Sequence, residues 1–136
     1  MFSFLSKYFE TDTRFYYLSL LKESNDTFSI HGLWPQYDKN SYPSYCKKDN
    51  FSIDKLQPII KELNYCWYSN EEKNSKFWEH EYYKHGSCMF TDMTELEYFQ
   101  KTIELYREAI RLDLPDKYYS NNKCLIPVSL EFKFSS

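Results

Sequence analysis

The stretch FWEHEYYKHGSC, residues 77–88, holds two of the three histidines of this 136-residue chain. If residues 77–85 form an α-helix, with about 100° of rotation per residue, then His80, Glu81, Lys84 and His85 share one face, and Phe77 falls in the same arc. Two imidazoles, a carboxylate and an ammonium on one face are typical of an active site. Each residue type is also common on a solvated helix face, so the interpretation needs support from a second motif.

The third histidine lies in a second dense stretch, IHGLWP, residues 30–35. Residues 27–32 alternate, with Phe28 and Ile30 on one side and His31 on the other, which predicts a strand carrying His31 on its polar face. The apolar run 15–21 predicts a buried strand paired with it, through a turn at residues 24–26. Residues 35–50 have no periodicity, and we expect a loop over the site.

The rest of the chain predicts an α+β fold, a small antiparallel sheet packed against helices in a single domain, residues 1–136. Apolar residues at helical spacing predict a helix over 53–63, interrupted or shortened by Pro58. The longest expected helix covers 94–112, with a capping box at its start and Pro115 ending it. Alternation over 128–134 predicts a half-buried antiparallel last strand.

Composition limits the kinds of partner. The net charge is −3 and the aromatic content 21%. A protein that binds nucleic acid by phosphate neutralisation over a broad face is basic, so any RNA contact is expected in a local cleft, with aromatic rings available for stacking. No apolar run is long enough to span a membrane. Residues 1–9 are apolar but short and lack a small-residue cleavage site, so we do not expect a signal peptide there.

The two histidine stretches resemble the active-site segments of the ribonuclease T2 family. The first family segment is His-Gly-Leu-Trp-Pro, matched by residues 31–35, and the second is Trp-x-His-Glu-x-x-Lys-His-Gly-Thr-Cys, matched by residues 78–88 with Ser87 in place of Thr. The chain departs from the family at residues 21–23, which read Leu-Lys-Glu where members usually have Gln-Trp-Pro. Members are usually several dozen residues longer, so we expect this chain to be truncated towards its C-terminus, between the long helix and the last strand.

The resemblance implies roles for the five polar residues. His85 would be the general base, His31 the general acid and His80 a phosphate ligand, while Glu81 and Lys84 would stabilise the transition state. The reaction would be transphosphorylation of single-stranded RNA to a 2′,3′-cyclic phosphate and a 5′-hydroxyl. We expect both the helix C-terminus and Glu81 to favour the charged form of His85.

The resemblance also implies the substrate contacts. Trp34, Tyr42 and Phe77 match positions that stack on or flank bases, although each is as readily explained by packing. Gln36 stands where some members have an Asp that reads adenine, so adenine preference is not expected. We expect no cofactor and no metal, since an ammonium beside the histidines suits phosphate better than zinc. We also expect no DNA cleavage, no membrane contact and a monomer.

The four cysteines contain no Cys-x-x-Cys pair, which favours two disulfides in an oxidising compartment over a zinc finger. The family resemblance implies a Cys46–Cys88 bridge, with free buried thiols as the alternative. Cys66 and Cys124 are then the second expected pair. The cysteines and the resemblance together suggest a secreted, endolysosomal or vacuolar location.

Two function classes remain open. One is an active endoribonuclease, favoured by the complete catalytic set. The other is a catalytically weak RNase-like RNA-binding or effector protein, favoured by the missing C-terminal portion.

Overall fold

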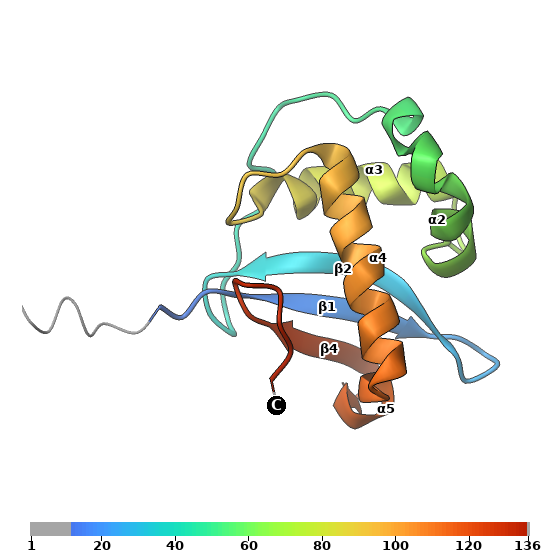
Figure 1. The fold of residues 1–136 in the computed structure, drawn as a ribbon, viewed down its shortest axis with the longest axis vertical. Coiled ribbons are helices and arrows are strands. Elements are labelled where there is room, and N and C mark those ends of the chain that lie inside the picture. Colours follow the sequence, from blue (N-terminus) through green and yellow to red (C-terminus); the bar gives the residue numbers. More distant parts are fainter. Residues whose placement is uncertain (1–11, 136) are drawn as a thin grey trace, which may run out of the picture.

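The computed structural model describes residues 12–135, which form a four-stranded antiparallel sheet covered by helices (Figure 1). The expected α+β class is confirmed. Residues 1–9, where the sequence indicates no signal peptide, lie outside the described residues.

The sheet has the strand order β2-β1-β4-β3. β1 (Phe15–Lys22) and β2 (Phe28–Gln36) form the expected hairpin, whose turn falls at residues 24–26. β4 (Lys123–Val128) pairs with the other side of β1, and the two-residue β3 (Tyr119–Ser120) pairs with β4. The first and the last strand of the described chain therefore pair in the middle of the sheet.

A β-bulge interrupts the β1–β2 pairing at His31. Ser19 is opposite Gly32 and Leu20 is opposite Ile30, which leaves His31 without a partner on β1. An extra residue in one strand shifts the inside–outside alternation by one position. As a result both Ile30 and Leu33 are fully buried, and His31 and Trp34 point to the same side of β2 although they are three residues apart.

Three aromatic side chains from outside the sheet occupy the outer edge of β2. The Tyr98 hydroxyl donates to the Leu33 carbonyl (3.0 Å) and accepts from the Leu33 N–H (3.3 Å). The Trp67 indole donates to the His31 carbonyl (3.1 Å), and the Tyr106 hydroxyl donates to the Phe28 carbonyl (2.6 Å). These hydrogen bonds replace the neighbouring strand that an edge otherwise lacks.

The helical segments follow the predicted order with shifted boundaries. The expected helix over 53–63 is a 3-10 helix, η1 (Ile53–Ile59), continued by α2 (Ile60–Cys66), because Pro58 lies inside the first part. The motif helix is α3 (Asn74–Lys84), followed by the short 3-10 turn η2 (Gly86–Cys88).

The long helix is α4 (Glu95–Arg111), and Thr94 and Glu97 form the expected capping box. Pro115 does not end this helix, as the sequence suggests. It lies in the first turn of a separate helix, α5 (Leu114–Tyr118), where its missing N–H costs nothing.

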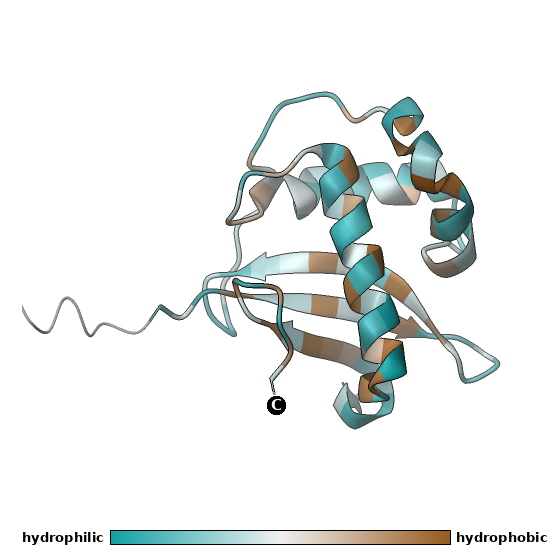
Figure 2. Cartoon of the chain, viewed as in Figure 1, coloured by the Kyte–Doolittle hydropathy of each residue, from teal (hydrophilic) through white to brown (hydrophobic). Residues whose placement is uncertain are grey.

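The core lies between one face of the sheet and α4, which crosses that face in Figure 1. Hydrophobic segments recur along the central strands and on α4 (Figure 2). The side chains that fill the core include Tyr16, Leu18, Ile30, Leu33, Trp67, Trp78, Tyr98, Phe99 and Ile126. The opposite face of β1 and β4 is left free to contribute to a surface cleft.

The predicted last strand over 128–134 is wrong. β4 ends at Val128, and a turn follows in which Phe132 has a positive φ of 62°. The turn is closed by a hydrogen bond from Ser129 N to Lys133 O (2.9 Å), and the Phe132 ring stacks on Tyr16 at 5.1 Å. The stacking of Phe132 on the core therefore decides the local structure, and the alternating pattern of residues 128–134 does not.

The expected Cys46–Cys88 disulfide is confirmed, with 5.1 Å between the Cα atoms. The expected Cys66–Cys124 bridge is wrong, because both are free and buried. Cys66 ends α2, where its thiol donates to the Glu62 carbonyl, and the Cys124 thiol on β4 donates to the Pro115 carbonyl. Each thiol is thus hydrogen-bonded to a different backbone carbonyl and not joined to the other cysteine.

Candidate active site

The end of α3 and the second half of β2 bring the predicted polar residues together around one cleft of 390 Å³, called here the narrow cleft. Its lining includes His31, Trp34, Tyr42, His80, Glu81, Lys84 and His85. The polar side of α3 therefore lies opposite β2, as the sequence predicts. The two elements are distant in sequence but line the same cleft.

Glu81 is the most enclosed of these groups, with only 2% of its surface exposed. Its Oε1 accepts a hydrogen bond from the Trp34 indole N–H at 2.9 Å, and its Oε2 lies 3.8 Å from His31 Nε2. Burial raises the pKa of Glu81 to about 7, against the opposing effects of the Trp34 hydrogen bond and the Lys84 charge. Its charge therefore changes close to neutral pH.

His85 follows the last residue of α3 and is 5% exposed. Its ring stacks on Trp34, with 4.8 Å between centroids and 23° between planes. Its Nδ1 is buried and has no hydrogen-bond partner among the described residues.

The expectation that His85 favours its charged form is wrong. Burial, with smaller effects from Lys84, His31 and His80, lowers its pKa to about 3. Desolvation outweighs the helix end, because the Trp34 ring encloses the imidazole and the Lys84 ammonium lies nearby.

His31 is the partly exposed histidine of the pair. Its ring meets Trp34 edge to face at 4.9 Å and lies 5.8 Å from the Phe77 ring. Burial, followed by the charges of His80 and Lys84, lowers its pKa. The bulge directs this ring toward Glu81 and the cleft.

Two basic side chains line the side of the narrow cleft that is open to solvent. His80 is exposed and Lys84 half-buried. The Lys84 ammonium lies 6.0 Å from the centroid of Tyr42, whose side chain is 50% exposed. An anion entering from solvent would meet these groups before it meets Glu81.

A second, wider cleft of 830 Å³ adjoins the first. The two share His31, His80 and Glu81, and Phe77 lies only in the wide one. Phe77 is thus separated from Trp34 and Tyr42, which line the narrow cleft. The three aromatic candidates therefore lie on both sides of the histidines.

Gly32 also matters for the geometry of the site, although the sequence motif alone suggests no role for it. A Cβ at this position would lie 2.3 Å from Glu81 Oε1 and 2.6 Å from Trp34 Nε1. Real Cβ atoms do not approach so closely, so the Trp34–Glu81 hydrogen bond requires glycine beneath it. The signal was present in the sequence, as a glycine beside a histidine inside a strand pattern.

Gln36, discussed above for adenine preference, also lines the narrow cleft, as do Lys39 and Asn40, which the sequence does not mark as contacts. The Gln36 side chain is buried and donates from Nε2 to the Asp38 carbonyl at 3.0 Å. The side-chain carbonyl oxygen of Gln36 takes no part in that hydrogen bond. No periodicity marks these residues, because they fall at the end of β2 and in the loop after it.

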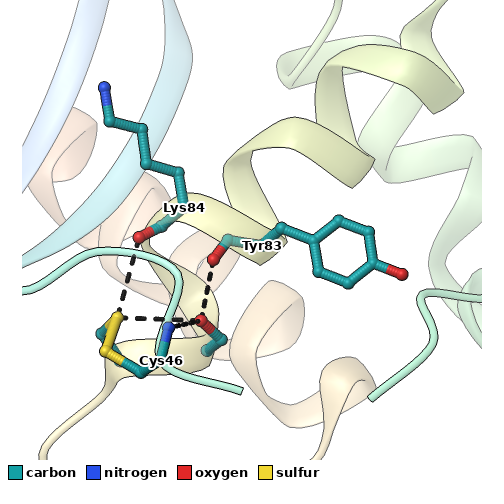
Figure 3. The surroundings of a disulfide bond; sticks show 5 residues. Cys46, Tyr83 and Lys84 are labelled. Carbon is teal, nitrogen blue, oxygen red and sulfur yellow. Dashed lines mark hydrogen bonds between the residues drawn. A yellow bond between two sulfur atoms is a disulfide. The ribbon is translucent and has the colours of Figure 1, made fainter. Parts of the chain in front are cut away.

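The loop is fastened to the end of α3 beside the site (Figure 3). Besides the disulfide, Cys46 N donates to the Ser87 hydroxyl (3.0 Å), and that hydroxyl donates to the Tyr83 carbonyl (2.8 Å). Tyr45 N donates to the Lys84 carbonyl (3.1 Å). The loop that carries Tyr42 is thus held against the helix that carries the histidines.

In residues 12–135, no group of three or more His, Cys, Asp or Glu side chains is arranged to hold a metal ion. No helix of the described chain has the length and apolarity needed to cross a bilayer.

Residues 7–118 match the ribonuclease T2 family, and the chain belongs to it. Ribonuclease DdI from Dictyostelium discoideum is 35% identical over 113 residues, 79% of this chain and 51% of that protein. A ribonuclease-like storage protein from Panax ginseng is 32% identical over 107 residues, 75% of this chain and 44% of that protein. The chain thus spans about half the length of these curated relatives, or less.

Solved structures confirm the fold. Ribonuclease MC1 from the seeds of bitter gourd has a TM-score of 0.68 at 19% sequence identity, with 89% of this chain and 91% of that chain covered.

Proposed function

We propose that this protein is a ribonuclease T2-type endoribonuclease that cleaves single-stranded RNA without a metal ion. The observation that carries the proposal is the convergence of His31 and His85 on one cleft, with Glu81, Lys84 and His80 between and beside them. RNA supplies its own nucleophile, the 2′-hydroxyl, so the protein needs a base, an acid and positive charge for the phosphate.

His85 is the proposed base that takes the 2′-hydroxyl proton, and His31 the proposed acid that protonates the 5′-oxygen leaving group. The lowered pKa of His85 supports this order, because a base must be neutral when substrate arrives. The phosphodiester brings a negative charge, which opposes the effects of Lys84 and His80 and raises the pKa of both histidines in the complex. His31 can then hold the proton it must donate.

His80 is proposed to hold the phosphate, since it is exposed and lines the narrow cleft. Glu81, next to His31, and Lys84 are proposed to stabilise the transition state. The products are a 2′,3′-cyclic phosphate and a 5′-hydroxyl, because the 2′-oxygen forms the new bond to phosphorus as the 5′-oxygen leaves.

The proposed substrate is single-stranded, because its bases must leave the stack to reach aromatic rings. Variants of ribonuclease MC1 have been solved in complex with 5′-GMP and 5′-UMP. Trp34 and Tyr42 in the narrow cleft and Phe77 in the wide one are proposed to contact bases on either side of the scissile phosphate. DNA is not a proposed substrate, because it lacks the 2′-hydroxyl.

The remaining proposals concern the protein as a whole. Residues 1–136 are proposed to act as one domain and as a monomer, with no cofactor. The Cys46–Cys88 bridge supports an oxidising compartment, so we propose a secreted, endolysosomal or vacuolar protein.

A catalytically weak RNA-binding or effector protein is the second candidate. It is favoured by the ribonuclease-like storage protein among the relatives. A single assay separates the candidates. The purified chain is incubated with poly(U) or poly(A) in EDTA, and the ends are tested for 2′,3′-cyclic phosphate.

Cleavage in EDTA with cyclic ends supports the enzyme. Binding without cleavage supports the second candidate. A matched oligonucleotide with one 2′-deoxy nucleotide at the scissile position serves as the control, and its continued cleavage at that position would contradict the mechanism.

A further inference from the structure

We propose that Trp34 is a positioning residue of this site, whose indole N–H holds the Glu81 carboxylate while its ring face holds the His85 imidazole. The proposal rests on the proposed cleavage of RNA and adds a role that base contact alone does not explain. One side chain would then set the geometry of the proposed base and of the carboxylate beside the proposed acid.

The contacts of Trp34 carry the argument. Its Nε1 donates to Glu81 Oε1 at 2.9 Å, its ring stacks on His85 with centroids 4.8 Å apart, and the His31 ring meets it edge to face with centroids 4.9 Å apart. A residue that only stacked on bases would need its faces free, yet one face of Trp34 is already covered by His85. Trp34 therefore touches the three groups whose relative placement decides an acid–base reaction.

The surroundings leave Glu81 with few alternatives to this partner. Glu81 is 2% exposed, so water reaches it poorly, and a buried carboxylate without a donor is costly. Gly32 leaves the space in which the indole and the carboxylate meet. The remaining titratable groups that face Glu81 are His31 on β2, His80, Lys84 and His85 on or after α3, and Tyr98 on α4.

The other two tryptophans provide a contrast within the same chain. Trp78 donates to the Trp67 carbonyl and Trp67 to the His31 carbonyl, so both meet backbone groups that do not titrate. The Trp34 indole alone among the three meets an ionisable side chain. Its N–H should therefore report the charge of Glu81, and the Trp78 N–H should not.

The first test follows the three indole N–H signals by ¹H–¹⁵N NMR across pH, assigned with single Trp→Phe variants. We expect the Trp34 signal to titrate with a midpoint near that of Glu81, about 7, and to lose this transition in Glu81→Gln. The Trp78 signal should stay constant. A Trp34 signal that does not move, or that moves equally in Glu81→Gln, would overturn the proposal.

The second test measures cleavage of a dinucleotide by Trp34→Phe, which keeps an aromatic ring but has no N–H. We expect kcat to fall about 10- to 100-fold, the scale of a small misplacement of reacting groups, with KM little changed. We also expect the acid limb of the pH profile to move to higher pH, because loss of the donor raises the pKa of Glu81 further. The effect should largely vanish in a Glu81→Gln background.

The matched control is Trp78→Phe, which also removes an indole hydrogen bond but leaves the site contacts intact. It should leave the pH profile unchanged. An unchanged kcat and pH profile in Trp34→Phe, or an equal shift in Trp78→Phe, would overturn the positioning role. A wild-type chain that cleaves no RNA while its Trp34 signal still titrates would overturn the proposed function and support the positioning of Glu81.

Discussion

The imidazole of His85 stacks on the indole of Trp34 at 4.8 Å, which joins the residue that follows α3 to the second half of β2. The contact encloses His85 so that its Nδ1 finds no hydrogen-bond partner in residues 12–135. The enclosed ring is held neutral in the free protein, and this neutral state has consequences for activity and for stability.

Replacing either proposed acid–base histidine should abolish most turnover. We expect His31→Ala and His85→Ala each to lower kcat on a dinucleotide by at least about 10²-fold, the usual size of one acid–base contribution. His80→Ala should mainly raise KM, because His80 is exposed at the mouth of the cleft. Steady-state kinetics measure both constants, and near wild-type turnover in His31→Ala would contradict its role as the acid.

The enclosure of His85 should make the protein less stable as the pH falls. The pKa of His85 is lowered from 6.5 to about 3 in the folded chain, so between these values the unfolded chain binds the extra proton. Stability is therefore lost as the pH falls below about 6.5, by at most roughly 1.4 kcal/mol per pH unit for this group.

His85→Phe keeps a ring against Trp34 and removes the titration. Urea unfolding at pH 7, 6 and 5 should show that the variant loses less stability than the wild type on the acid side. Glu81, whose pKa is raised, has the opposite effect, but it is present in both proteins and cancels in the difference. An identical pH dependence in the two proteins would show that His85 is not buried in its neutral form.

Gly32→Ala should lower both stability and activity, because it disturbs the Trp34–Glu81 hydrogen bond. The new methyl group would overlap Glu81 Oε1 and Trp34 Nε1, and we expect a loss of about 1–3 kcal/mol in unfolding free energy together with reduced kcat. Chemical denaturation and dinucleotide kinetics measure the two effects. In a Glu81→Ala background the stability cost of Gly32→Ala should shrink, and an equal cost in both backgrounds would place the strain elsewhere.

The Cys46–Cys88 bridge closes a sequence separation of 42 residues. The chain-entropy relation gives about 4 kcal/mol of stabilisation for a loop of this length, as an upper figure. The double variant Cys46→Ala/Cys88→Ala should lose stability on this scale in urea unfolding. A loss below about 1 kcal/mol would show that the unfolded chain is already constrained without the bridge.

Cysteine mapping checks the pairing itself. Burial raises the pKa of the Cys66 and Cys124 thiols to about 11, so both should resist alkylation until the chain is unfolded. Cys46 and Cys88 should react only after reduction. A peptide joining Cys66 to Cys124 would contradict the structure.

The helix face at residues 77–85 could be predicted because its information is local. Helical periodicity places His80, Glu81 and Lys84 together whatever the rest of the chain does. The charge state of His85 could not be predicted in the same way, since the deciding contact comes from Trp34 on a distant strand.

Two features of the sheet, the bulge at His31 and the position of the last strand, also depend on contacts between distant segments. The bulge at His31 depends on the register with β1, which no single strand encodes. The last strand, residues 123–128, contains a proline, which is unusual inside a strand, whereas the alternation of residues 128–134 favours a strand that does not form. Pro127 is tolerated because β3 pairs only with Lys123 and Cys124, which leaves that end of β4 without a second neighbouring strand.

The side chains along the outer edge of β2 also affect how copies of this protein can meet. Leu33 has both its backbone groups bound by Tyr98, and the carbonyls of His31 and Phe28 are bound by Trp67 and Tyr106. A strand from another chain would have to displace three aromatic side chains before it could add to the sheet here. The aromatic side chains that pack behind the candidate active site therefore also protect the protein from edge-to-edge aggregation at this strand.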